Sequence, residues 1–219
     1  DTDGHGTHVA GIAVGNAATG QTEAAAPNNF LWGQGMAPQA NYVTQNALLG
    51  PWPPANWGTL TRDSVNNGAA LMNNSWWDGG PAGSGYTANA RRFDQLVRDP
   101  NDATAALDHL VIVFSAGNSG GNERSITPPH EAKNIIVVGS SLTSRPGLGF
   151  PSEDIRGISG FSSRGPATGG RLLPNVVAPG TNVSSTWSET GDTVKYGQPI
   201  AGTGTPDPAN PANLLNQYI

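Results

Sequence analysis

The sequence predicts an α/β fold built around a mostly parallel sheet, and three observations support that prediction. Residues 109–118 (HLVIVFSAGN) and residues 134–140 (NIIVVGS) are short β-branched runs that are apolar on both faces. Such runs are typical of strands buried in a parallel sheet, whose strands are connected through helices. Residues 91–99 (RRFDQLVRD) provide one such helix, because Phe93 and Leu96 fall on one helical face with Val97 beside them.

Two further helices are predicted ahead of the first strand. Residues 8–18 (HVAGIAVGNAA) are small and apolar, which is typical of a helix that packs closely on another element. Residues 60–72 (LTRDSVNNGAALM) show a weaker amphipathic pattern and are also predicted to be helical. Parallel sheets bind their ligands beyond the carboxyl ends of the strands. We therefore expect chemistry at residues 116–118 (AGN), which follow the first apolar run.

Length and composition describe one soluble domain with many turns. The chain has 219 residues, only 12% of them charged, with 30 Gly and 18 Pro. A net charge of −5 argues against nucleic acid and anionic membranes as partners. No apolar run approaches the ~20 residues that span a bilayer. The absence of cysteine excludes a disulfide framework, a thiolate nucleophile and a cysteine-ligated metal.

A histidine flanked by glycines opens the first predicted helix, in the motif GHGTHVAG at residues 4–11. Histidine is the side chain best matched to proton transfer near neutral pH, so His5 is a candidate general base. A structural or solvated histidine is the alternative interpretation. A metal site on His5 and His8 is the weakest hypothesis, because no carboxylate follows at a fitting position and HExxH is absent.

A second candidate is Asn118, which ends the segment SAGN directly after the first apolar run. A fixed side-chain amide can donate a hydrogen bond to the oxyanion that develops in acyl transfer. The alternative is a turn asparagine that caps the next element.

These segments occur together with others in a recognisable order: MAPQAN (36–41), MNNSW (72–76), PHEAKNIIVVGS (129–140), FSSRGP (161–166) and PNVVAPGT (174–181). The sequence resembles the subtilisin-like serine proteases, the subtilases, and is most similar to their alkaline branch. The resemblance implies a three-layer α/β fold with a mostly parallel central sheet, here incomplete. It also implies hydrolysis of polypeptide substrates through an acyl-enzyme. We expect residues 1–203 to be a partial catalytic domain and residues 204–219 a divergent, Pro-rich tail.

The resemblance assigns roles to individual residues. It makes His5 the general base, His8 a helix-packing residue and Asn118 the oxyanion donor. It implies a strand edge whose backbone pairs with an extended peptide substrate, and, facing that edge, a wall of the first specificity pocket. The edge would be formed by Asn74, Ser75, Trp76 and Trp77, and the wall by Ser115, Ala116 and Gly117. Core packing is the alternative for Trp76 and Trp77.

The chain departs from the subtilase pattern at two positions of the triad. The family's Asp lies on a strand well before the HGTH motif, and Asp1 and Asp3 are interpreted as loop or helix-end charges. The family's nucleophilic Ser follows a Gly-Thr pair, but here Thr203 is followed by Gly204. Prolines at positions 206, 208 and 211 oppose the helix that would carry a nucleophile. We find no nucleophile and expect the chain as written to be inactive.

The remaining expectations concern partners and alternatives. No cofactor is required and no metal ligand is assigned, although the resemblance is compatible with structural calcium. We expect an extracellular monomer that binds polypeptide. The alternative function is a catalytically dead peptide- or glycan-binding module, with exposed tryptophan rings as its platform. The six tryptophans are at positions 32, 52, 57, 76, 77 and 187.

Overall fold

The structure is a computed structural model, and it describes residues 4–18, 20, 22, 31, 33–45, 56–104, 108–144, 152–183 and 185–186. The chain forms two compact units, each assembled from separate stretches of sequence. Unit 1 comprises residues 1–41, 141–157 and 179–219, and unit 2 comprises residues 42–140 and 158–178. The expectations for Asp1, Asp3, Thr203 and the 204–219 tail lie outside the described residues.

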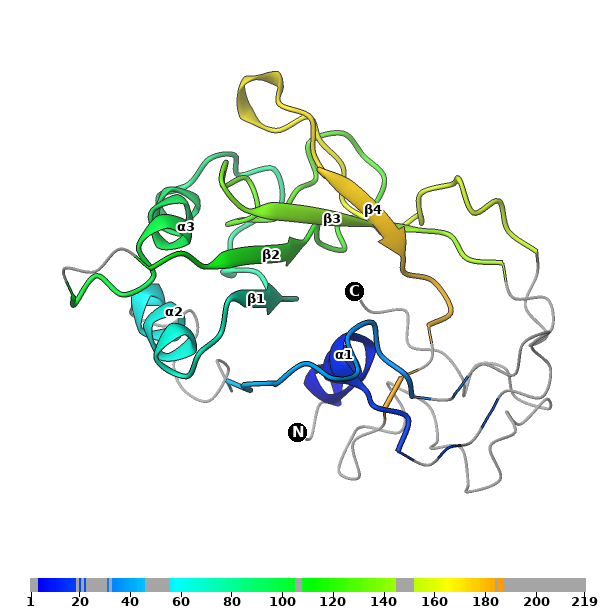
Figure 1. Ribbon diagram of the computed structural model, residues 1–219. Coiled ribbons are helices and arrows are strands. Elements are labelled where there is room, and N and C mark those ends of the chain that lie inside the picture. Colours follow the sequence, from blue (N-terminus) through cyan, green and yellow to red (C-terminus); the bar gives the residue numbers. More distant parts are fainter. Residues whose placement is uncertain are drawn as a thin grey trace. The chain divides into compact units, whose positions relative to one another are not determined.

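Most of the sheet belongs to unit 2. Four strands follow one another in space in the order β1 (Leu71–Asn74), β2 (Val111–Ser115), β3 (Ile136–Ser141) and β4 (Val176–Pro179), as Figure 1 shows. β1 pairs with β2 in parallel, and β2 pairs with β3 in parallel. The predicted α/β fold with a mostly parallel sheet is therefore confirmed. β4, whose sequence PNVVAPGT was used only for the resemblance, was not predicted as a strand.

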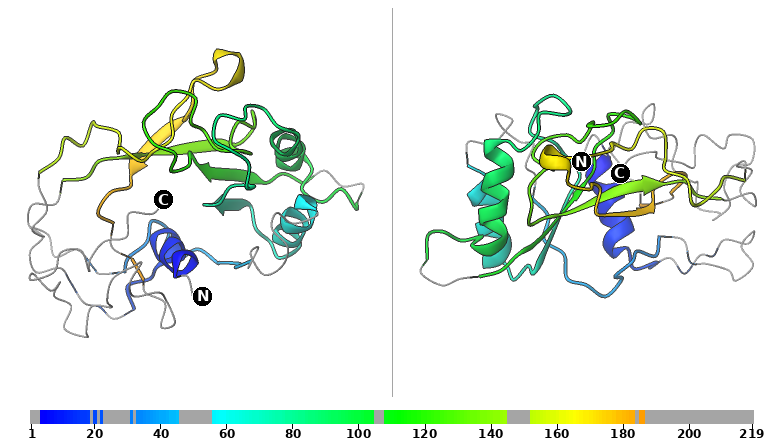
Figure 2. Two further views of the ribbon diagram at one scale, coloured as in Figure 1. Left: turned by 180° about the vertical axis from the view of Figure 1, so that it is seen from behind. Right: turned by 90° about the horizontal axis from the view of Figure 1, so that it is seen from above.

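Two helices of unit 2 lie next to each other on the same side of the sheet (Figures 1 and 2). They are α2 (Trp57–Asn66) and α3 (Ala88–Arg98), and a short 3-10 turn, η2 (Thr168–Gly170), follows β3. Each α-helix begins at a side-chain cap: Asn56 accepts from the Gly58 N–H, and Thr87 from the Ala90 N–H. These caps satisfy backbone donors that have no partner within the helix.

The prediction of a helix over residues 60–72 was wrong at its end. α2 stops at Asn66, and Gly68 has a φ of 83°, which a right-handed helix does not allow. Leu71 and Met72 belong to β1. The physical reason is the Asn-Asn-Gly sequence, which ends a helix and turns the chain into the next strand.

The core of unit 2 is an aromatic cluster between the helices and the inner face of the sheet. Phe93 of α3 and Phe114 of β2 are both 0% exposed, with ring centroids 5.2 Å apart in an edge-to-face arrangement. Trp57 of α2 stacks on Trp76, with centroids 4.8 Å apart. Aromatic pairs in these geometries contribute beyond the area they bury. The amphipathic stripe predicted for α3 is confirmed, since Phe93 and Leu96 are buried.

One face of the predicted strands is buried along its length, and the other face only towards the strand ends. Ile112 and Val137 are buried, whereas Val111 and Ile136 on the other face are 46% and 41% exposed. Ser115 and Ser140, at the far ends of that second face, are buried. The prediction of strands buried on both faces is therefore wrong at the start of each strand. None of the helices in the described part of the chain is long and apolar enough to cross a membrane.

Unit 1 contains α1 (His5–Val14), where a helix was predicted over residues 8–18. The helix begins three residues earlier and ends at Val14, since Gly15 has an extended ψ of 132°, so the predicted end at residue 18 was wrong. Gly4 precedes it with a φ of 81°. The chain returns beside the helix, where the hydroxyls of Ser185 and Thr186 donate to the carbonyls of His8 and Thr7 at 2.6 and 2.7 Å.

The aromatic cluster yields a test of the core. Phe93→Ala removes the ring that contacts Trp57, Trp76 and Phe114, and should lower the free energy of unfolding by about 3–5 kcal/mol. Gln95→Ala, at an exposed position of the same helix, should change it by less than about 0.5 kcal/mol. Urea unfolding followed by tryptophan fluorescence measures both, and equal effects would contradict the assignment of this core.

Candidate active site

The carboxyl end of β2 presents the first group of predicted residues. Ser115 and Ala116 are 8% and 2% exposed, and the chain then emerges so that Asn118 is exposed. Gly117 makes the turn with a φ of 100°, a conformation that favours glycine. A Cβ at this position would also collide with the Thr127 hydroxyl. The AGN segment lies beyond the end of a strand, where the sequence predicted it.

The FSSRGP segment holds the backbone on both sides of Asn118. The Ser163 N–H donates to the Gly117 carbonyl at 2.9 Å, and the Ser163 hydroxyl oxygen accepts from the Ser119 N–H at 3.0 Å. The Gly120 N–H donates to the Phe161 carbonyl at 2.9 Å. Ser163 itself is 0% exposed, so the residue that makes two of these bonds is held within the interior. A loop fixed in this way suits an amide that must be oriented before charge develops.

Sequence reasoning used FSSRGP for the resemblance and gave Ser163 no role. The residue lies 44 positions after Ser119, and two serines in a Gly- and Pro-rich segment give no local signal of such a contact. Ser163 nevertheless fixes both neighbours of Asn118 in the chain, Gly117 through its backbone N–H and Ser119 through its hydroxyl.

In the predicted substrate edge, residues 74–77, some side chains are buried in the core and others are exposed. Asn74 is 2% exposed; its amide donates to the Val113 carbonyl at 3.1 Å and its oxygen accepts from the Trp76 indole N–H at 3.1 Å. The ring of Trp76 packs against the aromatic cluster, whereas Trp77 is 53% exposed. β1 ends at Asn74, so Ser75, Trp76 and Trp77 follow the strand instead of belonging to it. Backbone pairing with a substrate stays a prediction.

His130, a buried histidine that the sequence analysis did not single out, contacts the segment 74–77. His130 is 1% exposed, and its Nε2 is 2.8 Å from the Trp76 carbonyl oxygen. Burial lowers the pKa of His130 to about 4, against the raising effect of backbone hydrogen bonds at Trp76 and Ala116 and of the Asp78 carboxylate. The imidazole is therefore neutral near pH 7. The motif PHEAKN contained it, but its partner is 54 residues away in the sequence.

The two histidines of the HGTH motif belong to unit 1. His5 is half-buried at the first position of α1. His8 is 3% exposed, and its Nε2 lies 3.2 Å from the Val183 carbonyl oxygen. Burial lowers the pKa of His8, with a smaller opposing effect from the Val183 hydrogen bond and a smaller lowering effect from His5. His8 is a packing residue, as expected; the general-base role of His5 stays a prediction.

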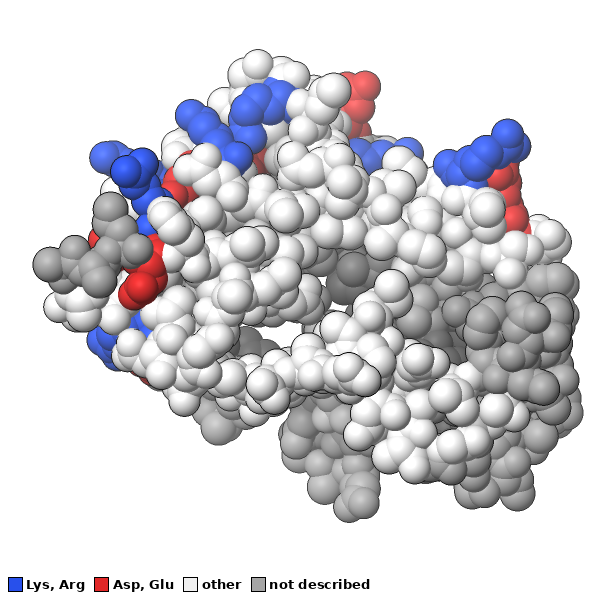
Figure 3. All heavy atoms as spheres, viewed as in Figure 1, with Lys and Arg blue, Asp and Glu red and all other residues white. Residues whose placement is uncertain are grey.

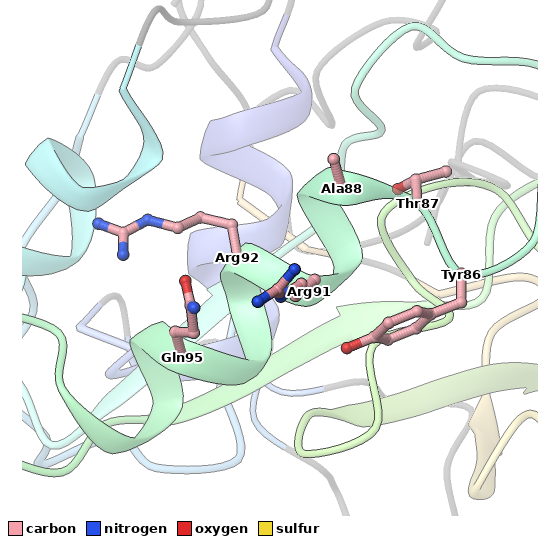
Figure 4. Close-up of a pocket in the computed structure, with 6 residues that line it drawn as sticks. All are labelled: Tyr86, Thr87, Ala88, Arg91, Arg92 and Gln95. Carbon is pink, nitrogen blue, oxygen red and sulfur yellow. The ribbon is translucent and has the colours of Figure 1, made fainter.

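Two further features bear on ligands. Within the described ranges, no three His, Asp or Glu side chains come together to hold a metal ion. Structural calcium, which also takes backbone and amide carbonyl oxygens as ligands, stays a prediction. A shallow pocket of about 450 Å³ lies on the outer side of α3, as Figure 4 shows. Its lining residues are Tyr86, Thr87, Ala88, Arg91, Arg92 and Gln95. It contains none of the predicted site residues.

Acidic and basic side chains are interspersed on the surface over α2 and α3 (Figure 3). Arg92 pairs with Asp102 at 2.6 Å, and Arg62 with Asp63 at 3.1 Å. Exposed pairs of this kind contribute little to stability.

The chain is similar in sequence to known serine proteases. A family model described as the Subtilase family matches residues 1–209. The serine protease AprX of Bacillus subtilis (strain 168) is 28% identical over 189 residues, which are 84% of this chain and 39% of AprX. Subtilisin DY of Bacillus licheniformis is 29% identical over an alignment of 220 positions, and this match covers 100% of this chain and 65% of that protein. The chain therefore spans less than two thirds of the length of these curated relatives.

Solved structures agree on the fold. The S41 psychrophilic protease superposes with a TM-score of 0.53 at 24% identity, over 97% of this chain and 62% of that one. Sphericase superposes with a TM-score of 0.50 at 22% identity, over 87% of this chain and 57% of that one. At these identities the likeness establishes the fold alone, and it confirms the subtilisin-like α/β architecture.

The depressed pKa of His130 predicts acid-sensitive stability. Because the unfolded chain binds the proton near pH 6.5 and the folded chain only near pH 4, this contribution is present above pH 6.5 and lost as the pH falls from 6.5 to about 4. The difference corresponds to about 3 kcal/mol.

The measurement is urea unfolding from about pH 7.5 to about pH 4.5. His130→Gln does not titrate, so its stability should approach that of the natural chain as the pH falls. His109→Gln, at an exposed histidine, should follow the natural chain throughout. Parallel pH profiles for the natural chain and His130→Gln would contradict the buried neutral imidazole.

Proposed function

This chain belongs to the subtilase family, and we propose that the protein it comes from hydrolyses peptide bonds in extended polypeptides through an acyl-enzyme. The observation that supports the proposal best is the placement of Asn118. Its side chain is exposed at the end of β2, while Ser163 fixes the backbone on both sides of it. A side-chain amide carried on a fixed backbone can donate to an oxyanion with little rearrangement of the loop during the reaction.

The remaining roles follow the order of events in acyl transfer. The substrate would lie extended between the segment 74–77 and the wall Ser115–Ala116–Gly117. His5 would accept the proton of the attacking hydroxyl and later deliver it to the leaving amine. Asn118 would stabilise the tetrahedral intermediate, whose oxygen carries the negative charge. The position of His5 at the start of α1 leaves it half-buried, which is compatible with contact to a substrate.

The 219 residues lack an identifiable nucleophile. The family's serine is expected after Gly202-Thr203, but Gly204 and Thr205 follow, and these positions lie outside the described residues. We propose that the 219 residues by themselves do not hydrolyse peptides and that the groove keeps its capacity to bind them. Action outside the cell, as a monomer, is part of the same proposal and is supported by the resemblance only.

The glycan-binding alternative needs several exposed tryptophan rings. Trp57 and Trp76 stack on each other within the core, and of the described tryptophans only Trp77 is exposed, at 53%. Trp32, Trp52 and Trp187 lie outside the described residues. Peptide binding without hydrolysis is the rival function that we separate from catalysis experimentally.

The oxyanion role is tested by Asn118→Ala in the full-length protein. We expect kcat to fall about 10²- to 10³-fold, the loss known for the amide donor of subtilisin, with little change in KM. Asn122→Ala, an exposed asparagine on the same loop, is the matched control and should leave kcat unchanged. Equal kinetics for both variants would refute the assignment of Asn118.

Sequencing the source locus through the codons for residues 196–219 tests the nucleophile directly. We expect a serine codon after Thr203, together with hydrolysis of casein by the encoded protein that His5→Ala abolishes. A locus that reads as printed, with no hydrolysis, would replace the protease proposal with peptide binding by an inactive subtilase.

A further inference from the structure

His130 is a buried histidine that the proposed chemistry does not use. It lies in the connection from β2 to β3, is 1% exposed, and packs against Phe114 with ring centroids 4.7 Å apart. A polar atom left unpaired in the interior is costly, so hydrogen bonds at both ring nitrogens stabilise a buried imidazole. In His130 both ring nitrogens have a partner, Trp76 for one and Thr127 for the other, and the Ala116 backbone contributes a further hydrogen bond.

The two partners fix which nitrogen carries the proton. Nε2 lies 2.8 Å from the Trp76 carbonyl oxygen, which can only accept, so Nε2–H is the donor. Nδ1 lies 3.1 Å from the Thr127 hydroxyl, which therefore donates to it. The neutral ring persists near pH 7 because burial lowers the pKa of His130, with Asp78 as the charged group that opposes this effect. The ring is thus held in one tautomer and one orientation.

This short series of hydrogen bonds touches both sides of the predicted substrate groove. The Trp76 carbonyl belongs to the edge formed by residues 74–77. On the other side, Thr127 lies directly against Gly117, because a Cβ added there would collide with the Thr127 hydroxyl. Gly117 is the last residue of the opposing wall. One imidazole and one hydroxyl therefore connect the two walls through the interior.

We propose that His130 is a positioning residue that holds the two walls of the groove at a fixed separation and thereby sets the affinity for the substrate. The inference rests on the proposed function, since these walls form a substrate groove only in a protein that binds extended polypeptide. His130 touches no reacting atom. Its loss should therefore weaken ground-state and transition-state binding alike, which raises KM and Kd while kcat changes little.

A purely structural role would look different. Loss of core packing lowers the free energy of unfolding, and it does so for any replacement that fills the space less well. If His130 positions the wall, peptide affinity should depend on whether residue 130 still donates a hydrogen bond to the Trp76 carbonyl, and not on the change in the free energy of unfolding. Two replacements of similar size, one with and one without an N–H donor, separate these roles.

Glutamine and methionine form such a pair. His130→Gln offers an amide N–H close to the place of Nε2, whereas His130→Met has similar length and no donor. Both are made in a His5→Ala background, so that no turnover disturbs binding. The probe is fluorescein-labelled oxidised insulin B chain, an extended polypeptide, and its Kd is measured by fluorescence anisotropy near neutral pH.

We expect His130→Met to raise the Kd roughly tenfold, as for the loss of one hydrogen bond, and His130→Gln to stay within about threefold of the parent. In the catalytically intact background the same change should appear in KM, with kcat within about twofold. Equal Kd values for the Met and Gln variants would overturn the inference.

Thr127 provides a second pair in case His130→Met does not fold. Thr127→Val removes the hydroxyl that orients the ring and keeps the shape, while Thr127→Ser keeps the hydroxyl. We expect the Val variant to weaken binding and the Ser variant to retain it, at similar urea midpoints. Weakening by both, in proportion to lost stability, would assign Thr127 and His130 to packing alone.

The outcomes also separate this inference from the proposed function. If the full-length protein hydrolyses polypeptide and all four variants bind like the parent, the function stands and the inference fails. If it does not hydrolyse but the donor-dependent change in Kd is seen, the inference stands and the protease proposal fails. If the parent neither binds nor hydrolyses the probe, both are overturned.

Discussion

The ring of Phe114 is the contact on which both the core and the candidate site of unit 2 depend. It lies edge-on to Phe93 and Trp76, with centroids 5.2 and 4.8 Å away, and it packs against His130. Because side chains alternate along a strand, a buried Phe114 fixes the orientation of β2 up to its last residue. The wall that begins at Ser115 then leaves the sheet in a defined direction. Core packing and the geometry of the groove are therefore consequences of one strand register.

The sequence was sufficient for features that depend on local periodicity or on a single conformational requirement. β2, β3 and α3 follow from their apolar patterns, and Gly117 from the turn that ends the strand. The end of α2 was missed because the amphipathic pattern continues past Gly68, whose positive φ breaks the helix. Ser163 and His130 could not be found locally, since their partners lie 44 and 54 residues away. Such contacts are produced by the fold and leave no periodicity in the sequence.

Burial distinguishes the histidines more clearly than motif position does. His8 and His130 are both buried with lowered pKa values, and each places Nε2 against a backbone carbonyl oxygen. A histidine used in this way acts as a neutral hydrogen-bond donor, because desolvation disfavours the cation that a general base must become. His5, at the first position of α1, is half-buried and belongs to a different environment. The burial argument therefore speaks against His8 and His130 as general bases but leaves both His5 and the exposed His109. The choice of His5 comes from the family motif and stays a prediction.

The residues proposed to bind substrate and the residues proposed to react are separable in this chain. Hydrogen bonds within unit 2 hold both parts of the candidate site. Ser163 fixes the backbone on both sides of Asn118, and His130 is bonded to the Trp76 carbonyl. Neither requires a nucleophile, so both persist in a chain that lacks the serine after Thr203. An oxyanion donor lowers a barrier only when charge develops on the substrate oxygen, whereas a groove of fixed width stabilises the bound ground state as well. Loss of the nucleophile would therefore abolish hydrolysis while leaving peptide affinity, and the same scaffold would change from an enzyme into a binding module without refolding.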